Sequence, residues 1–416
     1  MKVFAVLAAG LGWLNLVLVA LWIGATALLL NRSQAHLEAW PSDFGVFWQV
    51  SRLTLSGDVL RAFDTAAMAP VWQLPSTVSY AWEPLWLYPP TWTAMVAPVG
   101  LMPFSIAFAV FTAVTLVFFA LSLRGAAAVL PGGIMLVMAS PTLWASATIG
   151  NNAVLTAAIA VAALSALAAG RERRSGVAMA LMAIKPQLGV VLALAAFAAR
   201  ARGTVATAAA GSLAFLCVAT LICGFAYWPA FVEAFSAHDS GVRGDGGYQQ
   251  AVAVYGYMDL SITPYAYARA MGLGDMPALA LHLATALTGG ALAAMGWHRI
   301  AQARREGTAP GDGLVPSTIA LSLILIPLIP HRALPYEAMF LLAAVPFLWA
   351  AGAAAHWPGR VALVIAWFGV PRPVFDMAGI PVAGTMMPAI LLLLAYAAWQ
   401  VWRRRAVAPR PTAVTA

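Results

Sequence analysis

Charged residues are scarce in this chain, and that scarcity excludes an ordinary water-soluble protein. Asp, Glu, Lys and Arg make up 9% of the 416 residues, whereas 62% are hydrophobic and the mean hydropathy is +0.84. In soluble domains, about a quarter of all residues are usually charged. Apolar segments recur along the whole chain, with no polar block of domain size between them. The sequence therefore predicts one polytopic membrane domain.

Cysteine is nearly absent, which excludes a disulfide framework. Cys217 and Cys223 fall in one apolar helical stretch, separated by about 9 Å of helix rise, beyond normal disulfide reach. We interpret both as small core residues. The chain also lacks HExxH, GxxxxGK[ST] and GxSxG patterns, so nothing supports a metal centre or nucleotide-driven pumping. We expect no metal and no cofactor.

The net charge of +8 is distributed in a way that orients helices in a membrane, so we do not expect nucleic acid as a partner. Short arginine clusters lie beside apolar segments, and loops rich in Lys and Arg stay in the cytoplasm. The resulting topology places most of the 15 acidic residues on the outer side. The clusters are 171–174, 200–202, 299–305 and 403–405.

Apolar runs of roughly 20 residues predict the membrane crossings. Residues 3–30 are too long for a signal-peptide core, so we expect them to remain as the first span. Residues 175–199 have arginines at both ends and contain Lys185-Pro186. We predict a broken hairpin there, because one crossing would turn the later arginine clusters outward. The other expected spans are 104–123, 126–148, 153–169, 203–226, 276–298, 314–329, 338–355, 361–370 and 386–402.

The predicted architecture is an all-α bundle of about 10–12 transmembrane helices in a single domain over residues 1–405. Two large loops, 31–103 and 227–274, face outward in this topology, and the first should contain juxtamembrane helices. Both are dense in carboxylates, aromatic residues and glycines. We therefore expect a catalytic or binding surface on the outer face, and a disordered cytoplasmic tail at 406–416.

Asp43 is the first candidate for chemistry. It precedes Phe44, Phe47 and Trp48, which share one face at helical spacing, as in an interfacial amphipathic helix. Asp43 is either the N-cap of that helix or a carboxylate held at the membrane surface as a general base. Asp58 and Tyr88 lie in sequences that, taken alone, are turn signals.

Lys185 is an ionisable residue in an apolar stretch, which makes it a functional candidate unless it snorkels to the inner interface. A second polar cluster lies at an outward membrane end, at His331, Arg332, Tyr336 and Glu337. This cluster either binds a ligand or anchors the interface.

Five segments, in this order over most of the chain, resemble glycosyltransferase family 87, whose members are polyprenyl-phosphate-sugar-dependent enzymes of the GT-C superfamily. The most specific is K-P-Q-L-G at Lys185–Gly189. The others are D-F-x-x-F-W at Asp43–Trp48, L-x-G-D at Leu55–Asp58, Y-P-P-T at Tyr88–Thr91 and G-N-N-x-x-L-T-A-A at Gly150–Ala158. The chain departs from the family pattern at two places. It has Asn151 where the family has Gln after the glycine, and it has Tyr336-Glu337 where the family has Tyr-Asp.

The resemblance implies a GT-C-like fold and an inverting transferase, with Asp43 as its catalytic base. The donor would be a sugar on polyprenyl phosphate, a mannose-like hexose or a pentose, and the acceptor a lipid or glycan hydroxyl. Such an enzyme would lie in a bacterial inner membrane, with its active site toward the periplasm or cell exterior. Candidates for binding the donor phosphate are, in falling order, His331, Arg332, Arg243 and Lys185. Candidates for binding substrate are Trp48, Asp58, Tyr88, Asn151, Asn152, Tyr336 and Glu337.

A transporter or flippase for a lipid-linked sugar is the alternative function. It would need polar residues at the bilayer centre, and often internal repeats. The sequence has one buried lysine, no membrane-centred acid and no clear repeat. A purely structural scaffold is a third possibility, which the acidic outer loops disfavour.

Overall fold

The computed structural model describes residues 2–32, 43–64, 68, 86–243, 261–370 and 382–404. These ranges consist of α-helices and short 3-10 helices joined by turns, with no strand among them. Five helices within them are long and apolar enough to cross a membrane. The prediction of an all-α polytopic membrane protein is therefore confirmed.

The helices differ in length and place. The five long apolar helices are α1 (Lys2–Arg32), α5 (Phe104–Ala127), α11 (Arg202–Cys223), α15 (Asp275–Arg305) and α20 (Val382–Arg403). Shorter helices complete the bundle: α6 (Ile134–Met138), α7 (Pro141–Ile149), α8 (Ala153–Ala168), α9 (Glu172–Leu181), α10 (Val190–Ala198), α16 (Leu314–Leu325), α17 (Met339–Ala350) and α18 (Trp357–Phe368).

Four further helices complete the list: α2 (Asp43–Leu55), α4 (Pro90–Val96) and α12 (Tyr227–Arg243), which lie at one end of the bundle, and α14 (Pro264–Ala270), which packs against α15 and α20. The 3-10 helices are η2 (Val59–Phe63), η3 (Ala97–Leu101), η4 (Met182–Ile184), η5 (Pro186–Gly189), η6 (Ile326–Leu328), η7 (Pro335–Ala338) and η8 (Ala353–Ala355).

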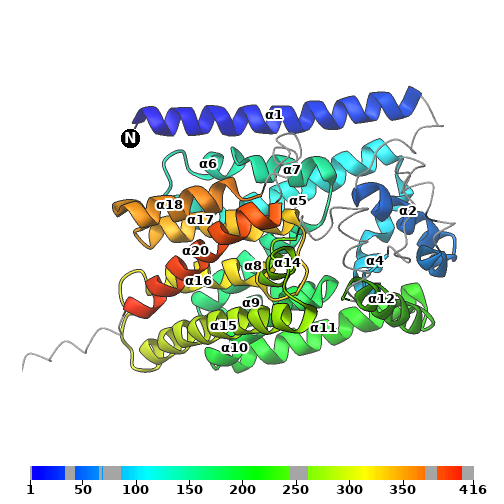
Figure 1. Cartoon of the computed structure of the whole chain (residues 1–416). Coiled ribbons are helices and arrows are strands. Elements are labelled where there is room, and N and C mark those ends of the chain that lie inside the picture. The colour runs from blue at the N-terminus through cyan, green and yellow to red at the C-terminus, as the bar shows by residue number, and fades with distance from the viewer. Residues whose placement is uncertain are drawn as a thin grey trace, which may run out of the picture.

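The core of the bundle is formed by α8, α16 and α17, most of whose residues are buried. A helix that is apolar on every side belongs inside a larger assembly. Small alanine side chains on α8 let it pack closely against α5, α9, α16 and α17. In contrast, α1 lies along one side of the bundle against α5, α6 and α7 (Figure 1) and exposes many large apolar side chains. The outer helices thus present a surface suited to lipid.

The prediction of a single span over residues 126–148 is wrong. Helix α5 continues to Ala127, and Gly132 and Gly133 then turn the chain with positive φ angles. A second break follows at Ser140-Pro141, where the Ser140 hydroxyl accepts a hydrogen bond from Thr142 N and caps α7. Proline is favoured at the first position of a helix, so the chain forms two short helices here.

The predicted broken hairpin over residues 175–199 is confirmed. Helix α9 ends at Leu181, and η4 and η5 carry the chain past Lys185 before α10 begins. The Gly203 N–H donates a hydrogen bond to Glu172 Oε2 at 2.6 Å, which joins the start of α11 to the start of α9. Both ends of the hairpin therefore lie on the same side of the bundle.

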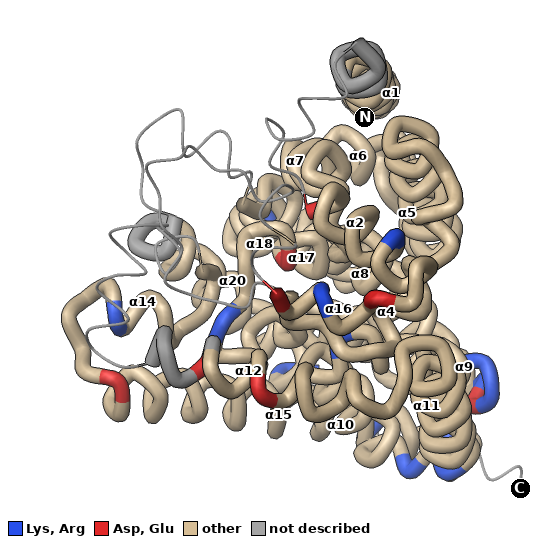
Figure 2. Tube along the Cα trace, turned by 90° about the vertical axis from the view of Figure 1, so that its right-hand side faces the viewer, with Lys and Arg blue, Asp and Glu red and all other residues tan. Residues whose placement is uncertain are grey.

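Basic residues connect the helix ends on that side. Arg304 Nη1 donates to Leu167 O at 3.0 Å, and Arg299 Nη1 donates to Val401 O at 3.2 Å. The opposite end gathers α2, α4 and α12, at the right of Figure 1 and away from the N-terminus. Figure 2 looks onto this second end and shows acidic and basic residues interspersed among α2, α4, α12 and α14. The tail 406–416, predicted to be disordered, lies outside the described residues.

Candidate functional site

Helix α2 is fixed to the bundle by its aromatic face. The Phe44 ring lies 5.1 Å from that of Phe108, and the Phe47 ring packs edge-on against Trp92 at 5.0 Å. On the same helix, the Ser51 hydroxyl donates to Val96 O at 2.8 Å. These contacts hold Asp43, which is partly exposed, in the first turn of α2, where the helix dipole favours a carboxylate.

The turn after α7 lies against the start of α2. Gly150 has a φ of 70°, and a Cβ on this residue would lie 2.6 Å from the Cβ of Phe44. Only glycine allows both the left-handed backbone and this close approach. The residue after Asp43 therefore touches the turn that contains Asn151 and Asn152.

The two asparagines of this turn are buried but incompletely hydrogen-bonded. Asn151 Oδ1 accepts a hydrogen bond from Ala153 N at 2.8 Å, at the start of α8. Asn151 Nδ2 and both polar side-chain atoms of Asn152 have no hydrogen-bond partner in the described part of the chain. Each unpaired buried polar group costs about 1–3 kcal/mol. A bound molecule with hydroxyl groups would supply the missing partners.

Lys185 and Glu337 form a buried ion pair. Lys185 Nζ lies 2.6 Å from Glu337 Oε1, and the two side chains are only 7% and 6% exposed. The rings of Tyr88 and Tyr336 lie 5.7 Å and 5.2 Å from the same nitrogen. Four predicted site residues from three separate parts of the chain thus meet. Sequence reasoning ranked Lys185 last because of its supposed depth and did not predict this pairing.

Two contacts position the ion pair at the broken hairpin. The Thr91 hydroxyl, on α4, donates to Ala183 O at 2.7 Å, just before Lys185. Helix η7, which carries Glu337, contacts α7, the helix that ends at Gly150. The pair therefore lies among the elements that lead to the glycine-asparagine turn.

Tyr227 is a structural residue that the sequence reasoning missed. Its hydroxyl accepts from Trp86 Nε1 at 2.6 Å, lies 2.6 Å from Thr93 Oγ1 and donates to Tyr88 O at 3.0 Å. Burial raises the pKa of this phenol, so it stays protonated. Tyr227 thereby ties α12 to the segment that presents Tyr88. No local pattern in the sequence indicates such contacts.

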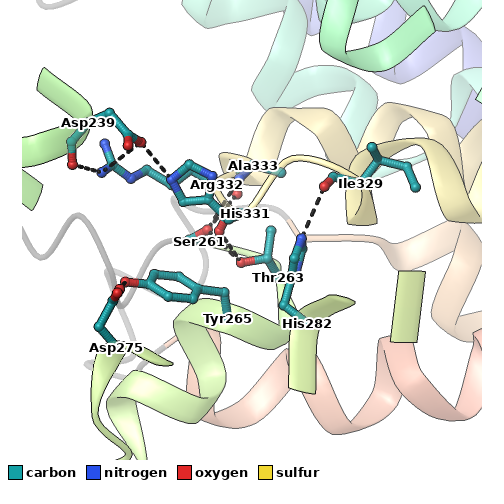
Figure 3. Close-up of polar contacts among 10 residues, drawn as sticks. All are labelled: Asp239, Ser261, Thr263, Tyr265, Asp275, His282, Ile329, His331, Arg332 and Ala333. Carbon is teal, nitrogen blue, oxygen red and sulfur yellow. Dashed lines mark hydrogen bonds and ion pairs between the residues drawn. The ribbon is translucent and has the colours of Figure 1, made fainter. Parts of the chain in front are cut away.

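A second polar cluster joins α12 to the segment after η6 (Figure 3). His331 Nε2 lies 2.9 Å from Asp239 Oδ1, and Arg332 Nη2 lies 3.7 Å from the same oxygen. Arg332 Nη2 also donates to Asp239 O at 3.2 Å. The structure thus brings together two predicted phosphate-binding candidates with an acid that was not predicted.

The residues before α14 hold that segment in place. The Thr263 hydroxyl donates to His331 O at 2.8 Å, and Ile262 N donates to Ala333 O at 2.9 Å. The Tyr265 ring meets His331 edge-on at 5.5 Å, and its hydroxyl donates to Asp275 Oδ1 at 2.5 Å (Figure 3). Burial, reinforced by Asp275, raises the pKa of Tyr265 to about 12.

Three predicted site residues are not among these clusters. Trp48 is buried, and its Nε1 donates to Met102 O at 3.0 Å, so its ring packs inside the protein. Asp58 is exposed and immediately precedes η2, beyond the far end of α2. Arg243 ends α12, and its side chain lies outside the described residues. Within those residues, no group of three or more His, Cys, Asp or Glu could hold a metal ion.

Comparison with known proteins identifies the family. A family model described as glycosyltransferase family 87 matches residues 86–327, more than half of the chain. This segment includes Tyr88, the glycine-asparagine turn and Lys185, whereas Asp43 precedes it and His331 follows it. No curated protein and no solved structure matches the chain. The chain belongs to glycosyltransferase family 87 and is a membrane glycosyltransferase.

Proposed function

We propose that this enzyme transfers a sugar from polyprenyl phosphate to an acceptor hydroxyl, with inversion at the anomeric carbon and with Asp43 as general base. One observation carries the proposal. The helix end with the partly exposed Asp43 carboxylate lies against a turn in which the buried Asn151 Nδ2 and both amide atoms of Asn152 lack partners among the described residues. A proton acceptor and unpaired sugar-binding groups thus lie on adjoining segments.

The chemistry follows from this arrangement. Asp43 takes the proton of the acceptor hydroxyl while that oxygen bonds to the anomeric carbon, from the side opposite the phosphate. The bond between the anomeric carbon and the phosphate oxygen breaks, and polyprenyl phosphate leaves with the electron pair. A positioned general base contributes about 10²–10⁴-fold to such a step.

The donor phosphate is proposed to bind at His331 and Arg332. A guanidinium forms short, charge-assisted hydrogen bonds to phosphate oxygens. Asp239 contacts both basic side chains, which supports a role in orienting them. The prenyl chain would stay in the bilayer, against the apolar outer surface. We place the enzyme in a bacterial inner membrane, with this end facing outward and with a lipid or glycan of the cell envelope as acceptor.

The test uses the full-length protein in liposomes, with polyprenyl-phosphate mannose or a polyprenyl-phosphate pentose as donor and envelope lipid extract as acceptor. Asp43→Asn should lower transfer by about 10²–10⁴-fold because the base is lost. The matched control is Asp58→Asn, which changes an exposed acid beyond the other end of α2 and should retain activity. Full transfer by Asp43→Asn contradicts the proposal. Movement of the donor across the bilayer without transfer would favour a flippase.

A further inference from the structure

We infer that Glu337 determines sugar specificity by binding a hydroxyl of the transferred sugar, and that Lys185 positions its carboxylate instead of binding the donor phosphate. The inference rests on the proposed function, since it requires a sugar substrate at this site. It assigns different partners to the two members of the ion pair.

The surroundings of Lys185 leave little room for a phosphate. Its ammonium contacts Glu337 Oε1 at 2.6 Å and lies near the rings of Tyr88 and Tyr336. Aromatic faces attract a cation, so the rings stabilise the ammonium where it lies. A phosphate that bound this nitrogen would have to displace Glu337 Oε1 from it. The pair also carries no net charge with which to attract an anion.

The other oxygen of Glu337 carries the argument further. Oε2 is buried and accepts no hydrogen bond from any described residue. An unpaired buried carboxylate oxygen is costly, more so than a neutral group. A hydroxyl donor would satisfy this oxygen, whereas phosphate or carboxylate oxygens would be repelled. The chemistry of Oε2 therefore matches a neutral sugar.

The position of Glu337 also fits the sugar end of the donor. Its helix η7 follows the segment of His331 and Arg332 directly and contacts α7, which ends at Gly150. Six residues of chain can span at most about 20 Å, so Glu337 lies within that distance of His331. The inference requires that a donor with its phosphate at His331 directs its sugar toward this region. A carboxylate there would bind a sugar that has one particular ring hydroxyl more tightly than a sugar that lacks it.

The experiment pairs one residue with one hydroxyl. The reconstituted wild type, Glu337→Gln and the charge-free double variant Lys185→Met/Glu337→Gln are assayed with polyprenyl-phosphate mannose and its 2-, 3-, 4- and 6-deoxy forms. In the wild type, one deoxy donor should lose about 10- to 100-fold in kcat/KM, as expected for a charged hydrogen bond. With the mannose donor, kcat/KM of both variants should fall by a similar factor relative to the wild type. Removing that one hydroxyl from the donor should then lower their kcat/KM little further. Equal deoxy penalties in all three proteins would overturn the inference.

A wild type that transfers neither these sugars nor a pentose would contradict the proposed function, and binding of the same five donors by calorimetry would then decide the inference. A coupled loss in binding between Glu337 and one hydroxyl would support it. Absence of binding, or uncoupled losses, would overturn it.

A second measurement tests the role of Lys185. Inhibition by the product, polyprenyl phosphate, should be unchanged in Lys185→Met, although discrimination among the deoxy donors is lost. Lys185→Arg should restore part of that discrimination. The comparison variant is Arg332→Gln, which should weaken product inhibition about tenfold by removing a charged hydrogen bond to phosphate. Weaker product inhibition in Lys185→Met would show that Lys185 binds phosphate after all.

Discussion

Lys185 Nζ and Glu337 Oε1 lie 2.6 Å apart, although the two residues are 152 positions apart in the chain. Both side chains are buried, so each charge depends on the other for compensation. Removing one partner of a buried pair leaves an uncompensated charge and typically costs about 3–5 kcal/mol, whereas replacing both by well-packed hydrophobic residues of similar volume is often neutral or stabilising.

This asymmetry predicts a strongly non-additive pair of substitutions. Lys185→Met alone and Glu337→Gln alone should each lower the apparent melting temperature of the detergent-solubilised protein by several degrees. The double variant should lose clearly less than the sum of the two single losses, since no bare charge remains. Melting temperatures measured by intrinsic fluorescence would check this. Additive losses in the double variant would contradict the prediction.

Gly150→Ala should disturb both stability and transfer. An alanine there must adopt a φ of 70° and bring its Cβ to 2.6 Å from that of Phe44, so α2 must move away from the turn. The matched control is Gly57→Ala, also at positive φ but with no atom within 4 Å of the new Cβ. Both variants bear the backbone cost of about 1–2 kcal/mol, and only Gly150→Ala should also lose most of its activity. Equal melting temperatures and activities would refute this role of the close approach.

Tyr265 should make stability fall at high pH. An unfolded tyrosine ionises near its ordinary pKa of 10, whereas the folded residue ionises at about 12. Its stabilising contribution is thus complete below pH 10 and is lost between pH 10 and pH 12, because the unfolded state releases its proton first. Tyr265→Phe should therefore show a smaller drop in melting temperature over this range than the wild type. Equal drops in the two proteins would exclude the effect.

The fold class could be predicted from the sequence because a transmembrane helix is marked by the length and hydropathy of one continuous segment. The hairpin at Lys185-Pro186 followed from the arginines at both of its ends, because one crossing would turn the later arginine clusters outward, and from the proline that stops the helix. The failure at 126–148 has a local cause that the sequence also contains. Gly132-Gly133 and Ser140-Pro141 break the helix, whereas the prediction of one span rested on the apolar composition of the segment alone.

The site could be predicted only in part. Individual residues can be identified by their type, but tertiary packing determines which residues contact one another. Lys185 stood out as an ionisable group in an apolar stretch, yet nothing near it in the chain indicates Glu337. Likewise, no pattern in the sequence indicated Asp239, although its Oδ1 lies 2.9 Å from His331 Nε2. Trp48 is the opposite case: it was selected as an aromatic residue beside the candidate base, and the structure shows it buried, with its Nε1 donating to Met102 O.

The orientation of the bundle is the remaining prediction, and exposed residues at its two ends allow a direct test. Arg202 begins α11 beside Glu172, among the basic clusters, whereas Ser56 follows α2 at the other end, and both side chains are exposed. Single-cysteine variants Arg202→Cys and Ser56→Cys would be made with Cys217→Ser and Cys223→Ala. Because basic clusters stay in the cytoplasm, a membrane-impermeant maleimide should label Ser56→Cys in intact cells and label Arg202→Cys only after permeabilisation. The reverse pattern would put Asp43 on the cytoplasmic side and exclude transfer on the outer face.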